Sequence, residues 1–191
     1  MDIRPAVASA VLLLSLLCPA ARAQPVDVQV ALQDGGKVVL DVSASVDAPR
    51  EQVWAVLTDY DHMAGFVSNL KSSAVIGHDG NTLQVEQSGE ARAGLLHFAF
   101  HSIRSVELVA PQEIRSHLVS GDFKSYEAVT RVTPQDGGRT LITFHGEYVP
   151  NRWVPPGLGP SLIKSETGKQ YDELIAEIHR RQPHAASAAS P

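Results

Sequence analysis

Apolar and polar residues alternate along most of this chain, which predicts a series of β-strands. The alternating segments are separated by short clusters of glycine, aspartate, asparagine and proline, which are typical turn residues. On this pattern the strands cover residues 26–32, 38–46, 72–77, 82–90, 95–109, 113–119, 123–132 and 140–149. Because strands joined by short turns pair with their neighbours in opposite directions, we expect one curled antiparallel sheet.

Residues 46–70 interrupt the strand pattern with two predicted short helices. An apolar stripe at helical spacing runs from residue 53 to residue 57, and turn residues at 58–61 separate it from a second apolar cluster. Glu51 places negative charge near the positive end of the first helix. Asp47 is expected to cap this helix by accepting hydrogen bonds from its free amides.

A long amphipathic helix is predicted near the C-terminus, from Pro160 to about Arg181. The preceding residues 151–160 contain too much proline and glycine to form a helix or a central strand. The apolar stripe of the helix consists of Leu162, Ile163, Thr167, Tyr171, Leu174, Ile175 and Ile178. Such a stripe needs a broad apolar partner, and we expect it to cover the concave face of the sheet.

The first 23 residues have the pattern of a signal peptide, with Arg4, an apolar stretch over 6–17 and an A-x-A cleavage site at 21–23. We therefore expect an exported protein, periplasmic in a Gram-negative bacterium and otherwise secreted. Cleavage after Ala23 would also remove Cys18, the chain's single cysteine. Disulfides and thiol chemistry are then excluded from the mature protein.

The remaining residues suit a single ligand-binding domain over 24–182, followed by a disordered tail over 183–191. The formal net charge is −5, and charge is mixed along the chain, which argues against nucleic acid as a partner. We expect a monomer.

The order of these elements, a strand, two short helices, an antiparallel meander and a long helix, resembles the helix-grip fold of the START/SRPBCC superfamily. The resemblance is carried by D-A-P-x-E-x-V-W-x-V-L-x-D-Y-x-x-M-x-x-F at residues 47–66, with further matches at 104–111, 121–123 and 148–156. Together these segments resemble the polyketide cyclase/dehydrase and coenzyme Q-binding START-like branch. The resemblance implies an α+β fold with a deep apolar cavity between sheet and helix, holding a lipid, isoprenoid quinone, sterol or aromatic polyketide.

Aromatic and aliphatic residues on the inner faces of the strands and helix are the predicted pocket lining. They are Leu96, Phe98, Phe100, Tyr126, Ile142, Phe144, Tyr148, Trp153, Ile163, Thr167, Tyr171 and Leu174. The hydroxyls of Tyr126, Tyr148 and Tyr171 are the candidates for a polar ligand contact, because a buried hydroxyl needs a partner. The alternative is that these residues are ordinary core.

No cofactor or metal site is predicted, although the chain contains eight histidines. His97 and His101 share one strand face but lie roughly 13 Å apart along it, too far to bind one metal ion. They alternate with the phenylalanines, so we expect them on the solvated face. No G-x-S-x-G, glycine-rich phosphate loop or H-E-x-x-H motif is present, and no catalytic residue is predicted.

Three functions fit this sequence. The favoured one is a carrier or binding protein for a hydrophobic small molecule, without chemistry. The alternatives are an enzyme of the polyketide cyclase/aromatase type and an accessory envelope domain with a filled cavity. Trp153 and Leu158, in the irregular segment before the helix, form a predicted lip that touches a membrane transiently during ligand exchange.

Overall fold

In the computed structural model, residues 26–93, 96–151 and 159–182 are described. The elements are β1 (Asp27–Leu32), η1 (Asp34–Gly36), β2 (Val38–Val46), α1 (Arg50–Leu57), η2 (Tyr60–Gly65), β3 (Leu70–Asp79), β4 (Thr82–Ala93), β5 (Leu96–Val109), β6 (Glu113–Gly121), β7 (Phe123–Pro134), η3 (Asp136–Gly138), β8 (Thr140–Pro150) and α2 (Gly159–Arg180). The helices among these residues lack an apolar stretch long enough to cross a membrane.

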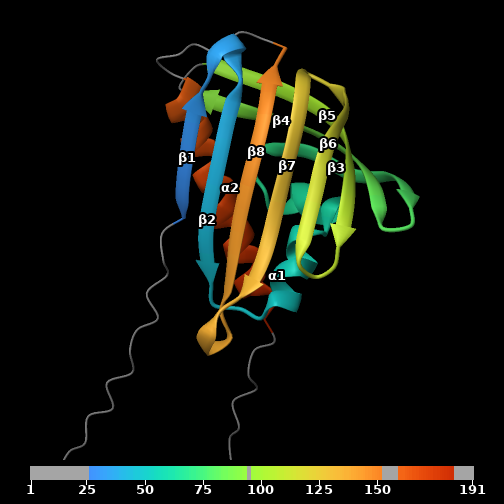
Figure 1. The fold of residues 1–191 in the computed structure, drawn as a ribbon, viewed down its shortest axis with the longest axis vertical. Helices are drawn as coiled ribbons and strands as arrows, with labels where there is room; N and C mark the ends of the chain where they lie inside the picture. The colour runs from blue at the N-terminus through green and yellow to red at the C-terminus, as the bar shows by residue number, and fades with distance from the viewer. Residues whose placement is uncertain (1–25, 94–95, 152–158, 183–191) are drawn as a thin grey trace, which may run out of the picture.

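The strands form one eight-stranded sheet in the order β1-β2-β8-β7-β6-β5-β4-β3. All seven neighbouring pairs are antiparallel, so β3 to β8 form a continuous meander and the β1–β2 hairpin joins it beside β8. Figure 1 shows the sheet curling around α2, which runs along its concave side. The predicted α+β helix-grip fold is confirmed.

The predicted pair of short helices is present, but the capping of the first differs from expectation. Pro49, not Asp47, occupies the N-cap position of α1, and no side chain caps the helix. The backbone oxygen of Pro49 accepts hydrogen bonds from the amides of Gln52 and Val53, so Asp47 lies too early in the chain to reach them. The second helix, η2, is a 3₁₀-helix.

The core lies on the concave side, between the sheet, α1 and the C-terminal half of α2. Its largest fully buried side chains include Ile142 of β8, Ile178 of α2 and Val53 and Val56 of α1. Helix α2 contacts β1, α1 and β4, so it closes the space between the two sides of the curled sheet.

Several predictions fall on residues outside the described part of the chain. They are the signal peptide over 1–23, the tail over 183–191, and the lip formed by Trp153 and Leu158. These stay predictions.

Candidate functional site: a cavity between the sheet and α2

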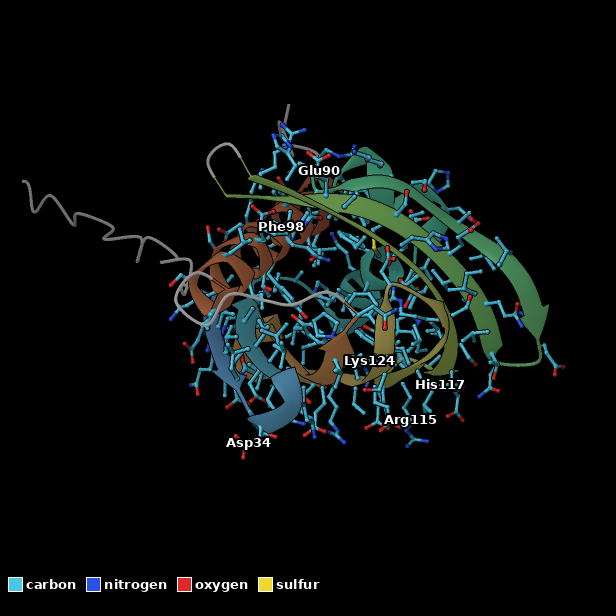
Figure 2. All side chains as sticks on the ribbon, turned by 90° about the horizontal axis from the view of Figure 1, so that it is seen from above. Asp34, Glu90, Phe98, Arg115, His117 and Lys124 are labelled. Atoms are coloured by element: carbon cyan, nitrogen blue, oxygen red, sulfur yellow. The ribbon has the colours of Figure 1, made fainter. Side chains whose placement is uncertain are left out.

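A cavity of about 430 Å³ lies between the inner face of the sheet and α2. Its walls come mainly from β4 to β8, from α2, and from the segment around η2. The sheet curls around α2, with Phe98 on the inner side of β5 and with Arg115 and His117 on the outer surface (Figure 2). The cavity exists because a strongly curved sheet encloses more volume than one helix fills.

Most of the predicted lining residues lie in the cavity wall. They are Phe98, Phe100, Tyr126, Phe144, Tyr148, Ile163, Thr167, Tyr171 and Leu174. They come from β5, β7, β8 and α2, and their inward orientation follows from the alternation of side chains along a strand and the helical spacing in α2. Whether they contact a ligand stays a prediction.

Three predicted lining residues are not placed in the wall. Ile142 is fully buried in the core instead. The reason is its position near the start of β8, where it pairs with Val132 of β7, the strand that α1 contacts. The side chain of Leu96 and the whole of Trp153 lie outside the described residues.

Arg104 of β5 is the most unusual residue in the wall. Its guanidinium donates to the side-chain oxygen of Gln87 and, at 3.4 Å, to the hydroxyl of Tyr126. It also lies 5.4 Å from the centre of the Tyr126 ring, a cation–π arrangement. Gln87 is in turn fixed by donating to Ser73 Oγ at 2.9 Å. The result is a polar centre in a largely apolar cavity.

The four tyrosines of the chain all line this cavity. The rings of Tyr126 and Tyr148 are stacked with centres 6.2 Å apart. Burial raises the pKa of Tyr60 to about 12, and the positive charge of Arg104 only partly opposes this. Burial likewise raises the pKa of Tyr148 and of Tyr171, with Tyr126 adding to both shifts. These phenols therefore stay protonated at neutral pH and are able to donate hydrogen bonds.

We call one end of the cavity the rim. The residues at this end come from the start of β5, the β6–β7 turn, the end of β8 and the start of α2: Phe98, Asp122, Phe123, Pro150, Leu162 and Glu166. Phe98 is 37% exposed, which is high for a large apolar side chain. Asp122 is held by accepting a hydrogen bond from the amide of His101 at 2.8 Å. This exposed aromatic side chain makes the rim the candidate entrance.

The histidines of β5 point away from the cavity. His97 lies 2.7 Å from a carboxylate oxygen of Glu90, and His101 lies 2.9 Å from one of Glu86. Within residues 26–93, 96–151 and 159–182, no three histidine, cysteine, aspartate or glutamate side chains gather as metal ligands.

Arg104 and Gln87 are the functional candidates that sequence reasoning missed. Both line the cavity: Gln87 lies on β4, and Arg104 shares one face of β5 with Phe98, Phe100 and Ser102. The sequence does contain a signal for Arg104, because this arginine continues the strand face that carries Phe98 and Phe100.

Comparisons with known proteins agree with this geometry. The family model described as polyketide cyclase/dehydrase and lipid transport matches residues 37–178. A search of curated proteins gives no match. The chain is similar in structure to the STAR-related lipid transfer protein from Xanthomonas axonopodis, with 12% identity, a TM-score of 0.67, and coverage of 84% of this chain and 97% of that one.

Two further solved structures are similar. The Zhui aromatase/cyclase from Streptomyces has 15% identity and a TM-score of 0.65, and the match covers 78% of this chain and 98% of that one. A START superfamily protein from Mycobacterium smegmatis has 16% identity and a TM-score of 0.64, with coverage of 74% and 97%. At these identities the likeness concerns the fold alone.

Proposed function

Since this chain belongs to the polyketide cyclase/dehydrase and lipid transport family of the START/SRPBCC superfamily, we propose that it binds a hydrophobic small molecule in the cavity beneath α2. It acts as a carrier or binding protein for a lipid, isoprenoid quinone or similar ligand. The observation that carries the proposal is the cavity itself, about 430 Å³ and lined mainly by apolar side chains. Small-molecule sites have this character and span roughly 300–1,000 Å³.

The cavity argues against the accessory-domain alternative, which expects a filled interior. A space of about 430 Å³ is far larger than a few waters require. The interior is therefore available to a ligand.

The chemistry of the wall favours binding over proton transfer. A general base works best when its pKa lies near the operating pH. Burial instead moves the pKa of Tyr60, Tyr148 and Tyr171 upward, away from neutrality. No histidine lines the described part of the cavity. The arginine in its wall stays protonated at neutral pH and so cannot act as a general base.

The test is to purify the protein from its host compartment and record its native mass spectrum. We expect an added mass that is released on denaturation and is extracted as a lipid-like molecule. A blocked variant sharpens the test: Ser102→Phe places a ring in the cavity wall, whereas Ser105→Phe places the same ring three residues further along β5, at a position that does not line the cavity. Bound ligand in Ser105→Phe but not in Ser102→Phe supports the proposal, and repeated empty preparations of the unmodified protein overturn it.

A polyketide cyclase of the aromatase type is the second candidate. It is favoured by the phenol of Tyr60 and the guanidinium of Arg104, which could donate hydrogen bonds to carbonyl oxygens of a precursor. Incubation with a linear poly-ketone precursor, followed by mass spectrometry, tests it. A ring product with the mass loss of water supports the enzyme, and unchanged precursor rejects it.

We also propose that the protein is exported, on the pattern of residues 1–23. N-terminal sequencing of the protein made in its host checks this. A mature chain that begins at Gln24 is the expected result, and retention of Met1 contradicts it.

A further inference from the structure

Arg104 and the exposed Arg139 are the arginines of the described residues that have no carboxylate partner, and of these two only Arg104 lines the cavity. The arginines that form ion pairs with carboxylates are Arg50, Arg92, Arg115, Arg131, Arg180 and Arg181. Arg104 has no carboxylate within ion-pair distance among residues 26–93, 96–151 and 159–182, although it is half-buried in the cavity wall. Its side-chain contacts, Gln87 and Tyr126, are both neutral.

The guanidinium also retains hydrogen-bonding capacity. Its Nε atom is buried and has no acceptor among the described residues. Two neutral acceptors leave most of the five N–H donors of an arginine free. An interior cation without a counter-charge is costly, whereas a carboxylate matches its planar fork with two parallel hydrogen bonds.

The acidic residues of the cavity do not supply this counter-charge. Asp122 and Glu166 line it, but neither forms an ion pair with Arg104. Asp122 accepts the amide hydrogen of His101 instead. The positive charge on the wall of β5 is therefore available to a bound molecule.

We propose that the ligand is an amphipathic monocarboxylate whose head group binds Arg104 and whose apolar body extends towards the rim. This rests on the proposed function and adds the chemical class of the ligand. Gln87 positions the guanidinium, and the hydroxyl of Tyr126 lies beside the head-group site. Phe100 and Phe98 continue the same face of β5 towards the entrance, so they contact the apolar body.

The geometry sets the length of the ligand. Arg104 lies six residues from Phe98, which corresponds to about 20 Å along a strand. A long unbranched or isoprenoid chain spans this distance, whereas a short carboxylate leaves the aromatic rim uncovered. The site thus selects for both an acidic head and an extended apolar chain.

The experiment measures displacement of the neutral dye Nile red by two ligands with the same chain, hexadecanoate and hexadecanol. We expect hexadecanoate to bind roughly 10–100-fold more tightly, because hydrogen bonds to charged groups are the stronger ones. In Arg104→Met the two ligands should bind with about equal affinity. In Arg104→Lys, which keeps the charge but loses the fork, the preference is intermediate.

The matched control is Arg115→Met, on the outer face of β6 (Figure 2). It should keep the full preference of the unmodified protein. Thermal unfolding of each variant separates loss of folding from loss of selectivity. Equal affinity for hexadecanoate and hexadecanol overturns the carboxylate proposal alone, whereas failure to bind Nile red and both ligands overturns the proposed function as well.

Discussion

The two halves of α2 are attached to the molecule in different ways. The C-terminal half is tied to α1, to η2 and to the segment that follows it. Its polar contacts are Ser68 N and Oγ to Glu173 at 2.8 and 2.6 Å, Gln52 Nε2 to the oxygen of Ile178 at 2.6 Å, and Arg181, just past the helix, to Asp59 at 2.8 Å. Tyr171, Leu174 and Ile178 of this half are also buried.

The half of α2 near the rim has weaker attachments. Among the described residues, no side chain of residues 159–167 forms a hydrogen bond or ion pair with another element. Leu162, Ile163 and Thr167 of this half line the cavity and are only partly buried, although Ile163 also packs against the edge of the core. The difference indicates that specific contacts hold α2 mainly at its C-terminal end, so that displacement of the rim end would break few of them.

The largest expected effect comes from truncating an isoleucine in each half of α2 and comparing the two losses of stability. Ile178→Ala should lower the free energy of unfolding by about 2–5 kcal/mol, because Ile178 is fully buried and leaves a void. Ile163→Ala should cost less than half as much, since one side of Ile163 already faces an open cavity. Urea unfolding of both variants checks this, and equal losses would contradict the anchored-end description.

A smaller effect is expected at the junction between the two halves, which is Gly168. A methyl group added at Gly168 meets no atom within 4 Å. Gly168→Ala should therefore stabilise the helix by roughly 0.5–1 kcal/mol. If the rim half bends at Gly168, the same variant also slows release of bound Nile red in a stopped-flow measurement. Stabilisation without slower release would show that the helix moves elsewhere.

The smallest expected effect concerns the acid stability of the anchored half. Hydrogen bonds from Arg180, and secondarily from Arg181, hold the pKa of Glu177 at about 2, below its ordinary 4.5. Because the pKa of Glu177 is lower in the folded protein than in the unfolded chain, its ionised carboxylate stabilises the fold. This stabilisation is complete above about pH 4.5 and is lost as the pH falls through about 2.

Glu177→Gln should therefore lose less stability than the unmodified protein between these pH values. The difference is about 0.3–0.5 kcal/mol per pair, since Arg180 is largely in water. Thermal unfolding at a series of pH values measures it, with Glu166→Gln at the rim as the control. If the pH dependence of stability is the same for Glu177→Gln and for the unmodified protein, the ion pairs of Glu177 do not help to anchor α2.

The fold could be predicted from the sequence because its signals are local. Turn residues at 34–36 and 136–138 place glycines where the backbone adopts positive φ, and the strands between turns show clear alternation. The capping of α1 was predicted wrongly, because the cap position depends on where the backbone turns at Pro49. Sequence pattern does not resolve a shift of two residues.

The site could be predicted only in part. Alternation identified which faces of β5 and β8 point inward, and so located Phe98, Phe100 and Tyr148. The placement of Ile142 in the core, and the meeting of Arg104 with Gln87 and Tyr126, depend on strand register and on a register shift between residues 103 and 104. These are properties of the assembled sheet, not of any one segment.

The gathering of every tyrosine around one cavity has an optical consequence. Because Tyr60, Tyr126, Tyr148 and Tyr171 all line this space, the tyrosine part of the near-ultraviolet spectrum reports on it alone. Replacement of cavity water by an apolar ligand changes the environment of these phenols together. The chain thus contains an intrinsic label, and occupancy of the cavity can be followed by difference absorbance without any added dye.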